Sequence, residues 1–201
     1  MMIDFFYPPQ PKRIWPESSY FKRLDRSPLW AGEIKYNGWR LLLNKNDKLN
    51  LFNRHATIID INPTIFESAF KKVPKNTVFD GELVEFRTTE LKNIIVFWDC
   101  MFWDGKDLRQ LPLSERRKYL KFDLAPEILT TTSHPQIFRT QQFKTGLIDL
   151  YNKIVTRNDP VEEGLVIKKI DSPYSWHHSR KVEIDDWIKV KKISDSAKVG
   201  S

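Results

Sequence analysis

The sequence of 201 residues is poor in cysteine and glycine, with a single cysteine, Cys100, and only seven glycines. One cysteine cannot form an intramolecular disulfide, so we expect no disulfide-stapled scaffold and a reducing, cytoplasmic compartment. No apolar run approaches the ~18 residues of a membrane span, and the first residues lack the basic-then-apolar order of a signal peptide. We therefore expect neither a membrane protein nor a secreted one.

Apolar, aromatic and basic residues are abundant. Hydrophobic residues make up 40% of the chain and aromatic residues 13%, including seven tryptophans. This composition can bury a sizeable core, and it is unlike that of disordered chains. The 33 lysines and arginines exceed the 26 acidic residues, which gives a net charge of +7. A basic balance is typical of proteins that bind a polyanion, but an ordinary solvated surface explains it equally well. We expect a monomer.

The distribution of proline divides the chain. Five prolines among the first 28 residues predict an extended arm over residues 1–28, packed on the domain and with few regular elements. A single domain is predicted over residues 29–193, followed by a short tail over residues 194–201.

Hydrophobic periodicity predicts a mixture of strands and helices. The predicted strands span residues 30–35, 40–44, 49–52, 78–86, 93–102, 164–169 and 187–191, and the predicted helices span residues 63–72, 113–122 and 145–156. In the first helix Ile65, Phe66, Ala69 and Phe70 are expected to share one face. Hairpin-like strands broken by few helices indicate an α+β fold with antiparallel sheets flanked by helices.

The first candidate for chemistry is Lys35, in the sequence Lys-Tyr-Asn-Gly. A lysine at the end of an apolar strand and before a tight turn projects its amine from the sheet edge into a cleft. Such a match is expected by chance about 0.7 times in this composition. Taken alone, it describes a surface lysine before a β-turn equally well.

Further blocks follow Lys35 in order. They are Asn53-Arg54-His55, Phe79-Asp80-Gly81-Glu82-Leu83, Phe97-Trp98-Asp99, Glu163-Gly164-Leu165-Val166-Ile167-Lys168 and Trp187-Ile188-Lys189-Val190-Lys191. The series resembles the motifs of the covalent nucleotidyltransferase superfamily, which holds ATP-dependent DNA ligases, RNA ligases and mRNA capping enzymes. The resemblance covers residues 30–192, and residues 97–117 look most like the DNA ligases. It implies an adenylation domain with an ATP-grasp-like ligase core.

The resemblance assigns the catalytic lysines. It implies that Lys35 attacks the α-phosphate of ATP and becomes adenylated. A free lysine amine, with a pKa near ~10.4, is protonated at neutral pH. We expect like charge from Lys189 and Lys191, together with a divalent cation, to disfavour the ammonium form. The same two lysines would bind the α-phosphate oxygens. The alternative is that Lys189 and Lys191 form one face of an amphipathic edge strand.

Two glutamates are assigned in the same way. The resemblance implies that Glu163 holds Mg²⁺, with Mn²⁺ as an alternative, and one carboxylate is enough for an ion that keeps several waters. Glu162 is the rival, but the family pattern places the acid directly before the glycine. Glu82 resembles the residue that accepts a hydrogen bond from the ATP ribose, whereas the alternative is an outward-facing acid on a strand.

The remaining assignments concern the nucleotide. Trp98 resembles the aromatic residue that stacks on the purine, Val166 would cover the opposite face, and Ile34 would lie beside them. Trp98 and Val166 could equally belong to the core. Glu33 is expected to accept from the adenine amino group. Arg40 and Arg54 resemble arginines that touch the nucleotide and the 5′-phosphate of a nick.

Two departures from the family pattern qualify the prediction. Asn37 stands where most DNA ligases have aspartate, which weakens the DNA assignment and raises a question about metal affinity. The residues after Lys192 leave no room for the OB-fold domain that follows in DNA ligases and capping enzymes, so we expect that the chain acts without this domain, that a partner supplies it, or that the chain is truncated. We expect an ATP-dependent polynucleotide ligase acting on nicked duplex DNA. The alternatives are an RNA or RNA/DNA hybrid ligase and an inactive nucleic-acid-binding module.

Overall fold

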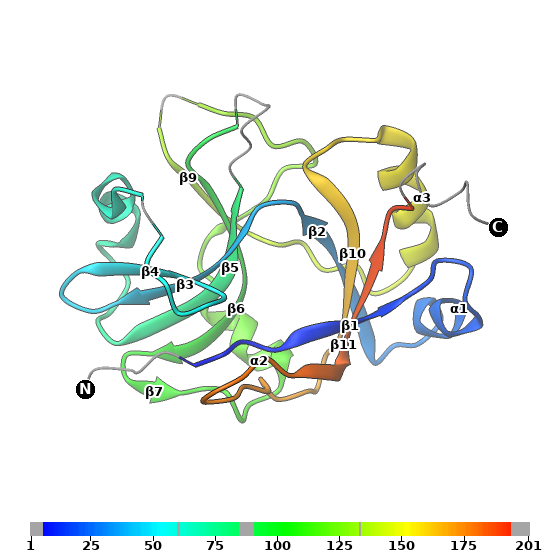
Figure 1. Cartoon of the computed structure of the whole chain (residues 1–201), viewed down its shortest axis with the longest axis horizontal. Coiled ribbons are helices and arrows are strands. Elements are labelled where there is room, and N and C mark those ends of the chain that lie inside the picture. Colours follow the sequence, from blue (N-terminus) through cyan, green and yellow to red (C-terminus); the bar gives the residue numbers. More distant parts are fainter. Residues whose placement is uncertain (1–5, 60, 85–90, 133, 194–201) are drawn as a thin grey trace.

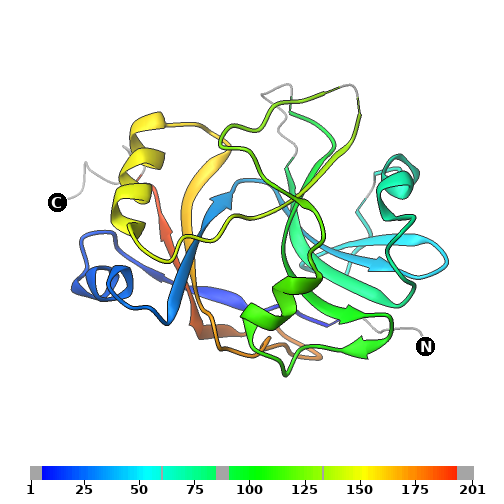
Figure 2. The ribbon, with the colours of Figure 1, turned by 180° about the vertical axis from the view of Figure 1, so that it is seen from behind.

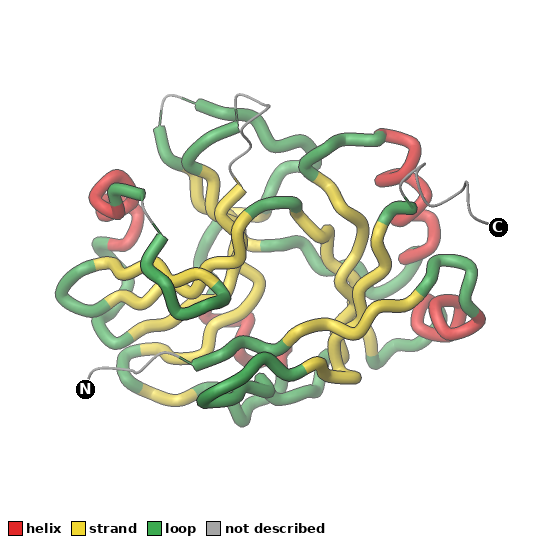
Figure 3. Tube along the Cα trace, viewed as in Figure 1, coloured by secondary structure: helices red, strands yellow, loops and turns green. Residues whose placement is uncertain are grey.

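The computed structural model describes residues 6–59, 61–84, 91–132 and 134–193. Two β-sheets lie side by side with short helices at the periphery (Figures 1 and 3). The smaller sheet has the order β1-β11-β10-β2. Its strands are β1 (Gln10–Ile14), β11 (Glu183–Lys191), β10 (Glu162–Lys169) and β2 (Trp30–Tyr36). It therefore joins strands from the beginning and the end of the chain.

The larger sheet is formed by the middle of the chain, in the order β4-β3-β5-β6-β9-β8. Its strands are β4 (Leu49–Asn53), β3 (Trp39–Lys45), β5 (Thr77–Val84), β6 (Ile94–Trp103), β9 (Gln136–Arg139) and β8 (Asp123–Leu124), and β7 (Lys106–Asp107) pairs with β6. Every residue of β5 is buried. The chain crosses from the smaller to the larger sheet at Asn37 and Gly38, between β2 and β3.

The helices cover the outer sides of the sheets. Figure 2 shows α1 (Ser19–Asp25) and α3 (Leu147–Arg157) together beside the smaller sheet, with η1 (Pro63–Phe70) at the opposite end of the molecule. The α2 (Leu113–Arg116) and η2 (Arg117–Tyr119) turns follow each other directly. Asp25 accepts hydrogen bonds from the Leu147 and Ile148 amides and so caps α3 from α1. Among the described residues, no helix is long and apolar enough to cross a membrane.

The predicted α+β class and the predicted strands are confirmed within the described residues, with bounds that shift by a few positions. The sheets are mixed, however, because β1 pairs in parallel with β11, and β9 pairs in parallel with both β6 and β8. Two regular elements, β1 and α1, occur where few were expected. A strand whose partner lies more than 170 residues away leaves no local signal. Residues 85–86 of one predicted strand and the predicted tail lie outside the described residues.

The predicted helices differ from the observed ones in type and length. The η1 segment is a 3₁₀-helix, in which Phe66 and Phe70 are buried but Ala69 is exposed. The prediction that Ala69 shares this face is therefore wrong: the core cluster takes in Phe66 and Phe70 and packs against Ile65, and Ala69 is not part of it. The predicted helix over residues 113–122 ends at Tyr119 and changes from α to 3₁₀ at Arg117. The predicted helix over residues 145–156 is confirmed as α3, with Leu147, Tyr151 and Ile154 buried.

Candidate functional site

A pocket of about 520 Å³ lies between the two sheets. Strands of both sheets contribute to its walls, because the β2–β3 connection carries the chain across this junction. All of the predicted site residues line it: Glu33, Ile34, Lys35, Arg40, Arg54, Glu82, Trp98, Glu163, Val166, Lys189 and Lys191. Residues spread over most of the sequence are thus brought to one cavity. Their individual roles remain predictions.

Three strands place Lys35, Glu163 and Lys191 together. Gly164 of β10 pairs with Lys35 of β2 on one side and with Lys191 of β11 on the other. The register shifts between Glu162 and Gly164, and such a bulge re-aims a side chain. Only glycine fits at position 164, because its φ is +137° and an added Cβ would lie 2.1 Å from the Val190 carbonyl oxygen. The glutamate before this glycine therefore enters the pocket.

The Glu163 carboxylate forms ion pairs with both lysines. Its Oε2 atom lies 2.6 Å from Lys35 Nζ and 2.8 Å from Lys191 Nζ. Burial raises the pKa of Glu163, but Lys35 and Lys191 outweigh it and hold that pKa below its usual range. Glu162 instead lies 3.3 Å from Arg157, and its side chain is buried away from the pocket. Of the two adjacent glutamates, Glu163 therefore faces the pocket and Glu162 does not.

Lys189 also faces the pocket, two residues from Lys191 on the same side of β11. The edge-strand interpretation of these lysines is wrong, because β11 lies between β1 and β10. Burial lowers the pKa of Lys189. Glu183 opposes that shift, and the charges of Lys191 and Lys35 add to it. The expectation that Lys189 and Lys191 supply like charge to Lys35 did not include the Glu163 carboxylate, which is the ion-pair partner of Lys35.

Glu82 is buried, with 9% of its surface exposed, so the interpretation as an outward-facing acid is wrong. It lies on β5 opposite Arg40 of β3. Burial raises the pKa of Glu82 to about 8, although the positive charges of Lys35 and Arg40 oppose the shift. At neutral pH the group is therefore mostly a neutral carboxylic acid. The sequence predicted a carboxylate at this position, and the difference follows from desolvation.

This raised pKa predicts a pH-dependent stability. The folded protein keeps the proton on Glu82 up to a pH of about 8, whereas the unfolded chain releases it near pH ~4.3. Between these limits the unfolded state binds fewer protons, so the free energy of unfolding falls as the pH rises. Glu82→Gln should remove this dependence, which amounts to up to about 4 kcal/mol between pH 5 and 9.

Urea unfolding of the parent and Glu82→Gln at pH 5, 7 and 9 would measure the difference. Glu67→Gln, at an exposed position of η1, serves as the control and should follow the parent at every pH. Parallel pH profiles for the parent and Glu82→Gln would contradict the assignment.

Trp98 and Val166 are half-buried and line the pocket, so neither is simply a core residue. The Glu33 carboxylate is already occupied. Its Oε1 atom accepts hydrogen bonds from Arg117 and Gln142, each at 2.9 Å, and its Oε2 atom accepts one from Lys168 at 2.7 Å. Three donors leave little free capacity on the two carboxylate oxygens. A hydrogen bond from an adenine amino group would therefore be a fourth one and would not replace any of the three.

Arg40 has a structural role that the sequence did not indicate. Its guanidinium makes a bidentate pair with Asp80, with Nε to Oδ1 at 3.0 Å and Nη2 to Oδ2 at 2.6 Å. Its Nη1 atom donates to the Pro9 carbonyl, and Tyr174 donates to the same Asp80 carboxylate. The Arg40 guanidinium is therefore held by Asp80 and Pro9, which are both groups of the protein. Arg54 differs, because it is exposed and no carboxylate of the described residues pairs with it.

The Lys-Tyr-Asn-Gly sequence has a different structural basis from the predicted tight turn. Gly38 is required by a close approach, since an added Cβ would lie 2.3 Å from the Leu83 carbonyl oxygen. Asn37 donates from its side chain to the Pro160 carbonyl and from its backbone to Val161. It anchors the segment before β10 and does not line the pocket.

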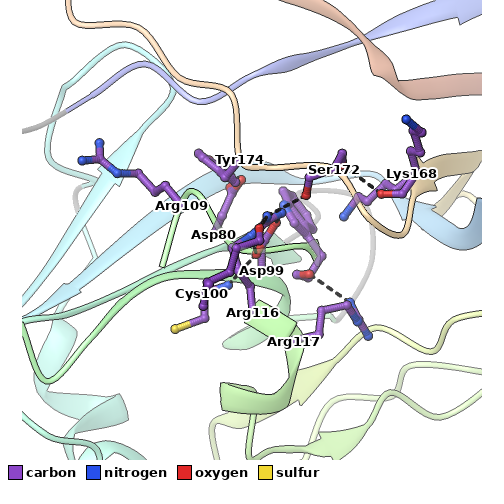
Figure 4. A network of polar contacts seen from close by, with 12 residues as sticks. Asp80, Asp99, Cys100, Arg109, Arg116, Arg117, Lys168, Ser172 and Tyr174 are labelled. Atoms are coloured by element: carbon purple, nitrogen blue, oxygen red, sulfur yellow. Dashed lines mark hydrogen bonds and ion pairs between the residues drawn. The ribbon is translucent and has the colours of Figure 1, made fainter. Parts of the chain in front are cut away.

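A network of buried charged residues lies next to the pocket. Figure 4 shows Asp99 and Arg116 at the centre of this network. Their side chains are fully buried and joined by two hydrogen bonds of 2.8 Å. Arg117 and Lys168 extend the network to Glu33. Arg116 and Arg117 lie within the stretch 97–117 that resembles the DNA ligases, but the sequence did not indicate their burial, because charged residues are mostly exposed.

Comparison with known proteins agrees with this geometry. The ATP dependent DNA ligase domain matches residues 84–191, which is more than half of the chain. The DNA ligase of vaccinia virus is 28% identical over 190 residues, covering 82% of this chain and 33% of the viral protein. The chain thus spans about a third of the length of the curated relatives it matches.

Solved structures share the fold. A mycobacterial DNA ligase D matches with a TM-score of 0.59 at 19% identity, covering 82% of this chain and 55% of that one. A structure of a Lig E DNA ligase matches with a TM-score of 0.61 at 15% identity, covering 95% and 70%. Together with the match over residues 84–191, these findings show that the chain belongs to the ATP-dependent DNA ligase domain family.

Proposed function

We propose that this chain is the adenylation domain of an ATP-dependent DNA ligase, with the nucleotidyltransferase core over residues 29–193 and Lys35 as the nucleophile. The observation that carries the proposal is the Lys35–Glu163–Lys191 arrangement, in which one carboxylate lies within 2.8 Å of two amines on the wall of a pocket. Family membership supports the same reaction.

The proposed reaction has three steps. The Lys35 side chain first gives a proton to solvent. Its nitrogen then forms a bond to the α-phosphorus of ATP while the bond from that phosphorus to the bridging oxygen breaks and pyrophosphate leaves. A 5′-phosphate oxygen next attacks that phosphorus, which breaks the P–N bond and returns the amine. The adjacent 3′-hydroxyl finally attacks the 5′-phosphate, a phosphodiester forms, and AMP leaves with the bonding electron pair. Lys189 and Lys191 would hold the α-phosphate oxygens, where negative charge must be stabilised.

The nucleotide is proposed to be ATP. The mycobacterial DNA ligase D structure is a complex with ATP, which supports this choice. Trp98 and Val166 provide apolar surface on the wall of the pocket for a purine, and Glu82 provides a polar group for the ribose. A protonated Glu82 can donate one hydrogen bond and accept another, so it still suits a hydroxyl partner.

The residues of the pocket fit Mg²⁺ if Glu163 is released from its ion pairs with Lys35 and Lys191. Mg²⁺ is usually bound through one or two carboxylates, several waters and substrate phosphates. Within the described residues no group of three or more metal-ligating side chains occurs, so an all-protein cage is not formed. Glu163 can supply the one carboxylate once Lys35 and Lys191 release it. When bound, the ion would neutralise charge on the phosphates.

The proposal is tested by incubation with α-³²P-labelled ATP and Mg²⁺, followed by a denaturing gel. A labelled protein band with ATP, and a weaker one with GTP, is expected. A chase with nicked duplexes built from DNA or RNA strands then identifies the substrate. Transfer of label to a 5′-phosphorylated DNA end supports the DNA ligase, and transfer only to RNA ends would assign an RNA ligase. Absence of any band would favour the inactive binding module.

Glu163→Gln should slow formation of the labelled adduct by at least about 10²-fold, because the amide carries no charge for either lysine or for Mg²⁺. Initial rates measured over a range of Mg²⁺ concentrations would show the effect. Glu162→Gln is the matched control, since the adjacent side chain faces Arg157 outside the pocket. A Glu163→Gln variant with the Mg²⁺ dependence of the parent would exclude the metal role.

A further inference from the structure

Arg13 of β1 and Trp15, just after this strand, form an exposed pair at one edge of the smaller sheet. The guanidinium carbon of Arg13 lies 4.8 Å from the centre of the Trp15 ring, and the tryptophan is 56% exposed. This stacking uses the face of the guanidinium, so the N–H groups at its edge stay available to a ligand. No carboxylate of the described residues forms an ion pair with Arg13.

The Arg13 side chain lies on the pocket side of the sheet. Along β1, Arg13 pairs with Lys189 of β11, and Ile14 pairs with Val190. Ile14 and Val190 pack in the core cluster that also takes in residues of α1 and α3. Because side chains alternate along a strand, Arg13 faces the opposite way, toward the side on which Lys189 lines the pocket. Burial is the main cause of the lowered pKa of Lys189, and the charge of Arg13 is among those that add to it.

The order of the strands places Arg13 at the end of a row of charged groups. The smaller sheet runs from β2 through β10 and β11 to β1 (Figure 1). Lys35 lies on the first of these strands, Lys189 and Lys191 lie on the third, and Arg13 lies on the fourth. The two lysines proposed to hold the α-phosphate therefore lie between the nucleophile and Arg13.

This row matches the direction in which the leaving group departs. In phosphoryl transfer the attacking atom and the leaving oxygen are roughly in line, on opposite sides of the phosphorus. With the α-phosphate held at Lys189 and Lys191, the Lys35 nitrogen attacks from the β2 side. The bridging oxygen and the pyrophosphate then leave toward β1, which carries Arg13.

We propose that Arg13, positioned by Trp15, binds the β- and γ-phosphates of ATP and the pyrophosphate that they become. The inference deepens the proposed function and rests on it. A planar guanidinium pairs well with phosphate oxygens, and negative charge builds on the leaving group as its bond to the α-phosphorus breaks. In the reverse reaction a pyrophosphate oxygen attacks the α-phosphorus of the adduct, the P–N bond breaks, and ATP forms. The released Lys35 amine takes up a proton from solvent.

The reverse reaction tests Arg13 without nucleic acid. Adduct of the full chain, labelled in its AMP group, is purified and mixed with increasing pyrophosphate, and the release of ATP is measured. Arg13→Gln should raise the half-saturating pyrophosphate concentration about 10-fold, because the bidentate donor is lost. Transfer of AMP from the same adduct to a nicked duplex should change by less than about twofold. Lys12→Gln is the matched control on the same strand, since Lys12 pairs with Asp185, and it should follow the parent.

The Trp15 variants test the positioning role. Trp15→Ala keeps the guanidinium but removes the ring that holds it, so the half-saturating pyrophosphate concentration should rise by less than in Arg13→Gln. Trp15→Phe keeps an aromatic face and should restore most of the parental value. An unchanged pyrophosphate dependence in Arg13→Gln would overturn the proposal. So would an effect confined to transfer to the nicked duplex, which would assign Arg13 to the nucleic acid.

A binding measurement separates this inference from the ligase function. The indole N–H resonance of Trp15, assigned by its loss in Trp15→Phe, is followed by NMR while pyrophosphate is added to the parent. We expect this resonance to shift in the parent and to shift much less in Arg13→Gln. If the parent forms no adduct but shows the shift, the ligase function fails and the pyrophosphate site stands. If adduct forms and the resonance does not move, the site fails and the ligase function stands.

Discussion

Replacing Lys35 with alanine is expected to lower formation of the covalent nucleotide adduct by more than about 10³-fold and to leave the fold intact. The substitution removes the nucleophile itself, and no other group in the pocket can replace a bond-forming atom at that position. The side chain is 22% exposed and its ion pair with Glu163 is at the pocket wall, so little packing is lost. Gel detection of α-³²P label, with circular dichroism on the same sample, measures both expectations.

Two comparisons make this prediction specific. Lys35→Arg keeps the positive charge beside Glu163 but offers a guanidinium that is not nucleophilic at neutral pH, so it should be equally inactive. Lys153→Ala, at an exposed position of α3, should form adduct at the parental rate. An undiminished band from Lys35→Ala would mean that another lysine is the nucleophile, and mass mapping of the labelled peptide would identify it.

Replacing Arg116 with methionine is expected to destabilise the protein by about 3–5 kcal/mol. The Arg116 and Asp99 side chains are both 0% exposed. The guanidinium also donates to the Leu111 carbonyl at 2.6 Å and to the Ser172 carbonyl at 2.9 Å. The variant would leave the buried Asp99 carboxylate and two carbonyl groups without a hydrogen-bond donor. The cost of burying these unpaired groups is larger than the net stabilisation that the ion pair provides. Urea unfolding at 25 °C measures the loss.

The neighbouring pair Lys118–Glu115 offers a matched control. Its side chains are 65% and 48% exposed, so Lys118→Met should cost less than about 0.5 kcal/mol. The double variant Asp99→Asn with Arg116→Met should recover part of the loss, because it removes the unpaired charge. Should Arg116→Met not fold at all, Arg116→Lys keeps the charge and is expected to lie between it and the parent. Equal losses for Arg116→Met and Lys118→Met would contradict the assigned role.

The same network connects stability to the site. Asp99 follows Trp98 on β6, and Arg117 follows Arg116 and reaches Glu33 on β2 at 2.9 Å. Arg117 also donates to the Trp98 carbonyl at 2.9 Å. The buried pairs thus fix the positions of strands from the two sheets relative to each other. Trp98 and Val166, which are proposed to contact the purine, lie on these strands, next to Asp99 and opposite Glu33. We expect substitutions that break the Asp99–Arg116 or Arg117–Glu33 pair to weaken nucleotide binding even in variants that still fold.

The sequence by itself determined the α+β class and the strands β2 to β6, β10 and β11, and its resemblance to a known superfamily indicated many of the residues that line the pocket. Runs and alternations of apolar residues are local signals, and they survive folding because a strand buries one face or, like β5, both faces. The order of the motifs around Lys35, Glu163 and Lys191 was readable through their resemblance to the covalent nucleotidyltransferase superfamily. The assembly of these residues around one cavity depends on the tertiary structure, which brings strands of both sheets to the pocket.

Only the tertiary structure decided how the charged groups pair. The pair of Arg40 with Asp80 was not indicated by the sequence, and Glu33 is engaged by donors from three separate segments. The parallel pairing of β1 with β11 likewise joins distant parts of the chain. Ion pairs, protonation states such as that of Glu82 and long-range strand pairings depend on distances between residues far apart in the sequence. No local pattern contains those distances, because packing of the two sheets creates them.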